Sequence, residues 1–474
     1  NMKVRTRYAP SPTGFMHIGN LRTAIFEYLL ARKYDGDFIL RIEDTDQERE
    51  VPGAIDFIYN TLKLCNFKID EGPNNPGNYG PYIQSERKEL YKKYALELVE
   101  KGSAYYCFCT EEEIQKDREE CEKRGKAYSY DGKCSRLLKE EIQEKLDSGI
   151  PYVIRQKMPK YGITEVNDLL YGKIKIDNSL LEDQILLKSD GYPTYNFANV
   201  VDDHLMEITH VVRGKEYLDQ TAKYNLLYDA FGWEKPTYIH VAMVLGEDGN
   251  KLSKRNGDAS FMDLYNDGYL PEAIVNYLAF LGWSPESNQE IFTLEELINA
   301  FEPSRISKSS SQYDVKKLRW INSHYIKKLN RDELFDLTYN HLKKAYDLSD
   351  KSIEWIKDLV CLYQDELKYG KEIVSLTSLF FSDYTTSDEC LEFMKQEGID
   401  NTINVFKEEV NNITLWNREN INMAINNTKE KAGVKGKMLY MPIRIKTTGI
   451  MHGPELDYTL YLLGKDKVLE YLNK

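Results

Sequence analysis

His17 and Gly19 follow APSPTG at residues 9–14, a short segment rich in proline and glycine. The apolar pattern predicts a strand before this segment and a helix after it. The first turn of a helix presents unpaired backbone N–H groups, which favour the phosphates of a nucleotide. Here His17 can donate a hydrogen bond to developing charge, and Gly19 lets a flat base approach the backbone. A plain turn with a surface histidine is an equally good interpretation of this segment alone.

A second polar segment, KLSKR at 251–255, carries Lys251 and Lys254 in a loop of Asp, Gly and Asn. Two ammonium groups on such a loop can neutralise a triphosphate during an in-line displacement. By itself the pattern is more typical of a solvated basic loop. Its meaning therefore depends on the first segment and on the elements that position both.

The elements expected around these residues form a parallel α/β sheet. A strand at 3–9, a helix that stops at Gly36 and a strand at 37–42 make a βαβ unit. From about 104 to 190 the pattern changes to short apolar runs around a polar stretch with cysteines, which indicates an insertion. Strand and helix signals then return, so the sequence predicts a split nucleotide-binding domain. An all-α region is expected beyond 323.

The two polar segments resemble the HIGH and KMSKS signatures of class I aminoacyl-tRNA synthetases, written here as His17-Ile18-Gly19-Asn20 and KLSKR. Longer segments resemble those of the glutamyl-tRNA synthetases, and the resemblance covers essentially the whole chain. They are RYAPSPTG at 7–14, RIEDTD at 41–46, the segment at 189–214 and GVKGKMLYMPIRIKTTG at 433–449. Asn20 replaces the last His of the first signature and Leu252 the Met of the second, and both changes are conservative for mechanism.

A glutamate pocket needs arginine for carboxylate and an acidic group for the ammonium, and Arg7, Glu43 and Arg213 supply these. Arg213 disfavours glutamine, because a neutral amide would leave a buried charge unpaired. Without the resemblance, structural roles would be the better interpretation of several of these residues. The resemblance implies that the pocket is lined by Arg7, Ala9, Ser11, Glu43, Tyr195, Asn199 and Arg213.

The resemblance implies a two-step reaction that uses ATP with Mg²⁺. The glutamate α-carboxylate attacks the α-phosphorus of ATP and releases pyrophosphate, and a terminal ribose hydroxyl of tRNA(Glu) then takes the glutamyl group. The residues expected at the phosphates and the adenosine are His17, Gly19, Asn20, Lys251, Lys254 and Arg255. The acids of RIEDTD are a weaker alternative as metal ligands.

Cys107, Cys109 and Cys134 form a plausible set of thiolate ligands for structural Zn²⁺, which needs four ligands in a tetrahedral array. Some family members supply a His two residues after the last Cys, where this chain has Arg136. Related proteins use a Tyr four residues before it, which is Tyr130 here, and Cys121 is another candidate. Reduced cysteines without metal are an equally good expectation.

Charge and hydropathy limit the remaining classes of function. The formal net charge of −13 disfavours a protein that coats nucleic acid non-specifically, so RNA contacts must come from local patches. Residues 401–450 hold eight Lys or Arg against four Glu, together with Tyr440, and the resemblance places anticodon contacts in this helical region. No apolar run is long enough for a membrane span and none resembles a signal peptide, so a cytoplasmic protein is expected. The odd count of seven cysteines favours thiols or a metal site over disulfides. The resemblance implies a monomer.

The expected domain organisation has five segments. They are 1–105 and 189–240 as the two halves of a Rossmann-like catalytic domain, 106–188 as an inserted acceptor-stem-binding domain, 241–325 as a stem-contact domain with the KLSKR loop, and 326–474 as the all-α anticodon-binding region. Three alternatives to a glutamate-specific enzyme stay open. They are an enzyme that also charges tRNA(Gln), a glutaminyl-tRNA synthetase, and a non-catalytic RNA-binding protein derived from a synthetase.

Overall fold

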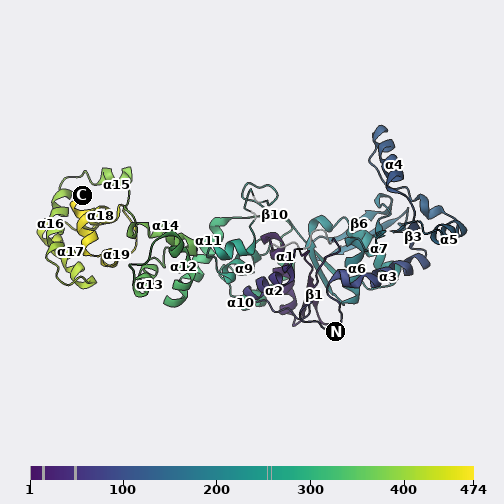
Figure 1. The fold of residues 1–474 in the computed structure, drawn as a ribbon, viewed down its shortest axis with the longest axis horizontal. Helices are drawn as coiled ribbons and strands as arrows, with labels where there is room; N and C mark the ends of the chain where they lie inside the picture. The colour runs from purple at the N-terminus through teal and green to yellow at the C-terminus, as the bar shows by residue number, and fades with distance from the viewer. Residues whose placement is uncertain (1, 13–15, 47–50, 254, 258) are drawn as a thin grey trace. The chain divides into compact units, whose positions relative to one another are not determined.

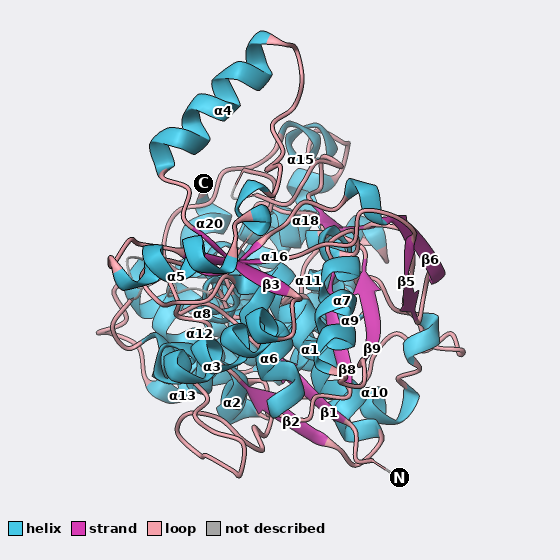
Figure 2. Cartoon of the chain, turned by 90° about the vertical axis from the view of Figure 1, so that its right-hand side faces the viewer, coloured by secondary structure: helices cyan, strands magenta, loops and turns pink. Residues whose placement is uncertain are grey.

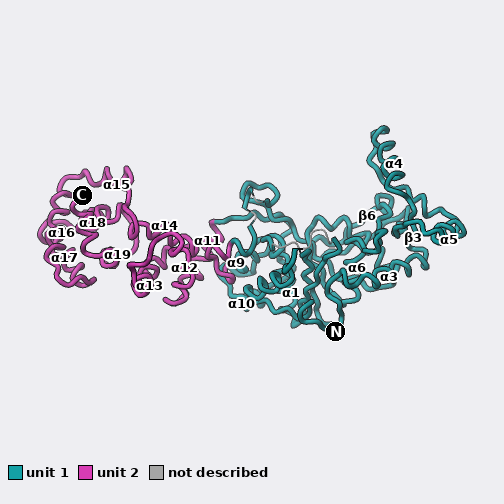
Figure 3. The backbone as a smooth tube through the Cα atoms, viewed as in Figure 1, with its two compact units in different colours: residues 1–263, 274–315 teal, residues 264–273, 316–474 magenta. Residues whose placement is uncertain are grey.

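The computed structural model describes residues 2–12, 16–46, 51–253, 255–257 and 259–474. The chain forms two compact units (Figure 3). The first comprises residues 1–263 and 274–315, and the second residues 264–273 and 316–474. Within the described ranges, no helix is long and apolar enough to cross a membrane.

The predicted βαβ unit opens the first compact unit (Figure 1). Strand β1 (Arg5–Tyr8) pairs in parallel with β2 (Asp37–Leu40), and α1 (Ile18–Lys33) connects them. The sequence predicts that this helix stops at Gly36, but it ends at Lys33, because Asp35 takes a φ of 52°. A Cβ at Gly36 would lie 2.1 Å from the carbonyl oxygen of Val4, so only glycine fits where the chain turns into β2.

A four-stranded sheet continues the catalytic part of the first unit, in the order β6-β5-β9-β8 (Figure 2). Its strands are β5 (Ile163–Asp168), β6 (Gly172–Asp177), β8 (His210–Gly214) and β9 (Thr237–Val241). Strands β8 and β9 are parallel, and β5 joins β9 through one parallel pair, Asp168 with Tyr238. The backbone N–H of Thr209 donates to Arg5 O at 3.0 Å, which brings the start of β8 beside β1. Strands β5 and β6 form an antiparallel hairpin.

The segment between the two halves carries a three-stranded antiparallel sheet in the order β3-β4-β7. The strands are β3 (Ala104–Cys107), β4 (Val153–Gln156) and β7 (Ile185–Leu187). This sheet packs with α3 (Lys88–Glu100), α6 (Tyr195–Leu205) and α7 (Thr221–Phe231) around a buried core. Helix α4 (Glu111–Lys123) and helix α5 (Lys139–Asp147) bury none of their residues.

The remaining elements of the first unit are short. They are α2 (Ala54–Leu64), β10 (Val244–Leu245), α10 (Leu294–Ala300) and β11 (Ser311–Gln312), and α8 (Phe261–Asn266) and α9 (Pro271–Ala279) run across the division between the units. Strands β10 and β11 are parallel and support the loop that follows Leu245.

The second unit is helical, with two hydrophobic cores. Its helices are α11 (Val315–Ile326), α12 (Arg331–Ala345), α13 (Ile353–Leu362), α14 (Ile373–Leu376), α15 (Asp388–Phe393), α16 (Ile399–Asn411), α17 (Arg418–Ala432), α18 (Lys437–Thr448), α19 (Leu456–Leu463) and α20 (Lys465–Asn473). The expectation of an α/β catalytic part followed by an all-α region is confirmed. The finer division into five segments stays a prediction.

Candidate functional site

A cavity of about 670 Å³ lies where β1, β8 and the start of α1 meet in the first unit. The predicted site residues that line it are Arg7, Ala9, Ser11, His17, Gly19, Asn20, Glu43, Tyr195, Arg213 and Lys251. Asn199 lies just behind this lining and reaches Arg213. Arg255 is exposed and is not part of the lining, and Lys254 lies outside the described residues. The cavity therefore brings both polar segments of the sequence to one place.

The start of α1 faces this cavity. No side chain caps its first turn, and Gly19 has open space where a Cβ would stand. The backbone N–H of Ile18 donates to Ala259 O at 3.1 Å, and His17 forms a β-bridge with Ser260. These contacts fasten the helix start to the chain that follows the KLSKR loop. The N–H groups of Gly19 and Asn20 in the same turn suit a phosphate.

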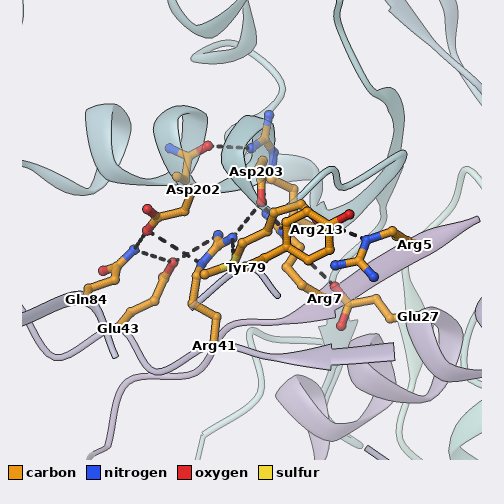
Figure 4. A network of polar contacts seen from close by, with 12 residues as sticks. Arg5, Arg7, Glu27, Arg41, Glu43, Tyr79, Gln84, Asp202, Asp203 and Arg213 are labelled. Carbon is orange, nitrogen blue, oxygen red and sulfur yellow. Dashed lines mark hydrogen bonds and ion pairs between the residues drawn. The ribbon is translucent and has the colours of Figure 1, made fainter. Parts of the chain in front are cut away.

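Asp203 is the centre of a buried ion network beside the cavity (Figure 4). It accepts two hydrogen bonds from Arg7, at 2.8 Å from Nε and 3.2 Å from Nη2, and a third at 2.8 Å from Arg41 Nη1. Burial alone would raise the pKa of Asp203, but the two guanidinium groups lower it. The pKa of Arg7 is raised although burial opposes its charge, because Asp203 is so close. Arg7 is thus held charged and rigid at the cavity wall.

Glu43 stands at the same wall with weaker partners. Its Oε2 lies 3.4 Å from Arg41 Nη2 and 3.2 Å from Gln84 Nε2. Burial raises the pKa of Glu43 to about 7, and Arg41 and Arg7 offset only part of this effect. A nearby cation, such as the ammonium of an amino acid, would stabilise the ionised form of this buried carboxyl group.

Arg213 is only 5% exposed, and its guanidinium has neutral partners. It donates to His240 Nε2 at 3.1 Å and to Thr221 Oγ1 at 3.2 Å, and it lies 3.5 Å from Asn199 Oδ1. Its carbon Cζ lies 4.5 Å from the centre of the Tyr224 ring. Among the described residues, no carboxylate forms an ion pair with Arg213. A buried guanidinium without an ion pair at a cavity wall is chemically suited to an anion.

The three predicted thiol ligands gather at the end of β3. The Sγ atoms of Cys107, Cys109 and Cys134 all lie within 4.8 Å of one another, with Cys109 and Cys134 at 3.5 Å. Tyr130 Oη lies 3.3 Å from Cys107 Sγ and 3.5 Å from Cys109 Sγ. Tetrahedral Zn–S bonds of about 2.3 Å place sulfurs about 3.8 Å apart, so the cluster fits zinc. Cys121 on α4 is not part of this cluster.

The basic segment at 401–450 is only partly free for RNA. Lys431 pairs with Glu409, and Arg418 pairs with Glu455 and Asp457. The other cations of this segment include Lys435 and Lys437 at the start of α18, which are exposed. Tyr440 on the same helix is 47% exposed. The start of α18 is therefore the part of the segment that combines exposed charge with an exposed ring.

Sequence reasoning did not identify several residues that hold the cavity wall. Arg41 belongs to RIEDTD, and Asp202 and Asp203 belong to the matched segment at 189–214, but nothing in the sequence pairs them with Arg7. Asp168 and His240 were missed as well. Asp168 is the last residue of β5, and His240 lies within β9. These positions in the sequence do not show which residue each of them contacts.

The sequence matches the family described as tRNA synthetases class I (E and Q), catalytic domain, over residues 3–320, and an anticodon binding domain over residues 333–474. The fold and the cavity thus define a class I tRNA synthetase. Glutamate-tRNA ligases from Geobacillus thermodenitrificans and Clostridium botulinum are 46% and 48% identical, with 99% and 100% of this chain and 98% of each relative covered.

Solved structures give the same result. A glutamate tRNA ligase from Elizabethkingia meningosepticum, in complex with its amino acid, has a TM-score of 0.88. The glutamate-tRNA synthetase from Elizabethkingia anophelis has a TM-score of 0.90. Each is 33% identical over 100% of this chain and 99% of its own. The chain belongs to the glutamate-tRNA ligase family.

Proposed function

We propose that the chain joins L-glutamate to tRNA(Glu) in two ATP-dependent steps. The observation that carries this proposal is the buried guanidinium of Arg213, which faces the cavity without a carboxylate partner among the described residues. The γ-carboxylate of glutamate supplies the missing negative charge. Glutamine would place a neutral amide there and leave the charge unpaired, which costs several kcal/mol in a buried site.

The other side chains that line the cavity bind the remaining groups of the substrate. Glu43 takes the α-ammonium, and Arg7, held by Asp203, provides a fixed positive charge for a carboxylate. Ala9, Ser11, Tyr195 and Asn199 shape the pocket. The α-carboxylate then attacks the α-phosphorus of ATP while pyrophosphate leaves, and no protein nucleophile is needed.

The start of α1 and the KLSKR loop serve the phosphates. His17, Gly19 and Asn20 line the cavity beside uncapped backbone N–H groups, and Lys251 approaches from the loop. These groups stabilise the negative charge that develops on the phosphates, because they are already positioned around it. Lys254 and Arg255 of the same loop contribute further positive charge. Mg²⁺ that accompanies ATP shields the phosphate charge. In the second step a terminal ribose hydroxyl of the tRNA attacks the carbonyl carbon of the glutamyl adenylate, and AMP leaves as the new ester forms.

Zinc binding and RNA contact complete the proposal. Three thiols and the Tyr130 hydroxyl at tetrahedral spacing support a structural Zn²⁺ held by Cys107, Cys109, Cys134 and Tyr130. The match to an anticodon binding domain supports tRNA contact by the second unit. We place this contact at the exposed Lys435, just before α18, and Lys437, its first residue. The monomeric state and the cytoplasmic location remain predictions.

ATP-pyrophosphate exchange tests the proposed function. It is measured with glutamate and with glutamine, each with and without tRNA(Glu). We expect exchange with glutamate when tRNA is present, since this family is expected to need tRNA to activate its amino acid. Preference for glutamine would contradict the role of Arg213. Absence of exchange with either amino acid would favour the non-catalytic RNA-binding alternative.

A further inference from the structure

His240 lies behind Arg213 and has no part in the reaction described above. It is 0% exposed in strand β9, and it bridges two charged groups. Its Nε2 accepts a hydrogen bond from Arg213 Nε at 3.1 Å, and its Nδ1 lies 2.7 Å from Asp168 Oδ1. A carboxylate, an imidazole and a guanidinium therefore form a chain that ends at the cavity.

The two partners fix the protonation of the ring. An ionised carboxylate only accepts hydrogen bonds, so Nδ1 carries the proton that Asp168 receives. A guanidinium only donates, so Nε2 must offer its lone pair to Arg213. Burial lowers the pKa of His240, and Arg213 lowers it further, against the opposite effect of Asp168. The ring is thus neutral in a single tautomer, which is the only form that satisfies both neighbours.

Asp168 is itself immobilised by the backbone. Its Oδ2 accepts from the N–H groups of Leu170 at 2.9 Å and Tyr171 at 3.0 Å, in the turn between β5 and β6. Its Oδ1 also accepts from the backbone N–H of His240 at 3.0 Å. Four hydrogen bonds therefore hold this carboxylate. The imidazole cannot rotate without breaking its bond to a rigid partner.

The chain of contacts determines how Arg213 presents its donors. With Nε bound to His240 and Nη2 bound to Thr221, the plane of the guanidinium is fixed. An arginine that is free to rotate can turn away from an amide and bind water instead. A fixed guanidinium cannot do so, and it meets the amide nitrogen of glutamine donor against donor.

We propose that Asp168 and His240 are positioning residues that hold Arg213 in the orientation that selects a carboxylate over an amide. This inference rests on the proposed function, in which Arg213 binds the γ-carboxylate of glutamate. It adds that the selectivity depends on the acceptor at His240 Nε2, and not on the charge of Arg213 alone.

Two substitutions at one position separate this role from mere packing. His240→Asn puts an amide where Nδ1 stands, so it keeps a partner for Asp168 but removes the acceptor for Arg213. His240→Gln puts an amide oxygen where Nε2 stands and retains that acceptor. We expect His240→Asn to raise the KM for glutamate about tenfold or more and to lower the preference for glutamate over glutamine by a similar factor. We expect His240→Gln to recover most of both losses.

The measurement is ATP-pyrophosphate exchange by the full chain with tRNA(Glu) present, with kcat and KM determined for glutamate, glutamine and ATP. His210→Asn is the matched control, because His210 lies on the neighbouring strand β8 and contacts Thr209 at 2.7 Å, away from the cavity lining. It should leave all three KM values unchanged. The KM for ATP should also stay unchanged in both His240 variants.

Three outcomes would overturn the inference. They are a His240→Asn protein with wild-type selectivity, a His240→Gln protein as impaired as His240→Asn, and a KM for ATP that rises as much as the KM for glutamate. If His240→Asn does not fold, Asp168→Asn takes its place, and wild-type selectivity in that variant would overturn the inference in the same way. Failure of the proposed function is distinct, since the wild-type chain itself would then show no exchange with glutamate.

Discussion

At the scale of single residues, the cavity wall contains arginines in two electrostatic states. Arg7 shares the carboxylate of Asp203 with Arg41, so it has an anionic partner inside the protein. Within the part of the chain that the structure describes, Arg213 hydrogen-bonds to His240, Thr221 and Asn199, and none of these is a carboxylate. Because a buried charge without a counter-charge opposes folding, this difference supports the proposal that a ligand supplies the counter-charge of Arg213.

Replacement of Arg213 by Gln should separate catalysis from stability. We expect kcat/KM for glutamate in ATP-pyrophosphate exchange to fall at least about 100-fold, because the γ-carboxylate loses a buried charged partner. The Tm without substrates should stay the same or rise, since no carboxylate is left unpaired in the protein.

Arg32→Gln is the control for Arg213→Gln, because Arg32 pairs with Asp70 away from the cavity lining. It should retain wild-type exchange. A large fall of Tm in Arg213→Gln would mean that this residue is structural.

Glu43 should give the reaction a pH dependence near neutrality. Its pKa is about 7 in the folded protein without substrate, and the ammonium of glutamate binds only the ionised form. We therefore expect kcat/KM for glutamate to fall up to about tenfold for each unit that the pH drops below about 7. Measurement of exchange between pH 5.5 and 8.5 checks this expectation, and a flat profile would contradict it.

Glu43 also makes the stability of the folded protein depend on pH. Because the pKa of Glu43 is higher in the folded protein than the usual value of 4.5, the folded state binds the extra proton between these two values. Its contribution therefore becomes less favourable as the pH rises from about 4.5 to about 7, and it is constant above that range. Glu43→Gln should remove this part of the pH dependence of Tm.

At the scale of elements, the thiol cluster is built by a strand end, the loop that follows it and a short 3₁₀ helix. Cys107 closes β3, Cys109 follows it, and Cys134 lies in the short 3₁₀ helix Lys133–Arg136. Neither α4 nor α5 buries a residue, so this part of the chain has little core of its own. A bound metal ion therefore adds more to the folding stability of this segment than it would to a well-packed one.

Metal analysis should find about one zinc ion per chain, as a single tetrahedral site requires. Cys109→Ala should lose most of this zinc and lower the Tm, because one thiolate ligand is removed. Cys121→Ala should keep the zinc, since Cys121 stands outside the cluster. Zinc that persists in Cys109→Ala, or is lost in Cys121→Ala, would assign the fourth ligand differently.

At the scale of the whole molecule, the two compact units alternate along the chain. Residues 264–273 belong to the second unit, where the backbone N–H of Leu270 donates to Asn322 Oδ1 at 2.9 Å and Gly370 N donates to Gly268 O at 3.0 Å. A division at a single point of the sequence would separate these partners. The chain therefore passes between the units more than once.

Electrostatic contact with RNA should depend on the start of α18. We expect the double substitution Lys435→Glu and Lys437→Glu to raise the KM for tRNA(Glu) about tenfold or more and to weaken its salt dependence. The KM for ATP should not change. Aminoacylation at several salt concentrations measures both effects.

The double substitution Lys63→Glu and Lys68→Glu is the matched control. It makes the same change of net charge at exposed sites of the first unit. An equal effect of the two pairs would show that total charge matters and that α18 is no specific contact surface.

Much of this molecule follows from the sequence alone. The βαβ unit, the insertion and the helical region beyond 323 were predicted from apolar periodicity, because local spacing determines which face of an element is buried. The cavity is lined by His17, Gly19, Asn20 and Lys251 of the two signatures, but not by Arg255, and the role of each residue remains a prediction. The boundaries were less accurate, as at Lys33, where the conformation of Asp35 ends the helix.

Only the tertiary structure determined which arginines have a carboxylate as a partner. The sequence supplies Arg7, Arg41 and Arg213 as equivalent cations, but the fold brings Asp203 to the first two and His240 to the third. Asp168 reaches His240 across 72 positions of sequence because β5 pairs with β9. Residue types and local periodicity carry information about class and elements. Pairing between distant side chains depends on strand register and burial, which exist only once the chain has folded.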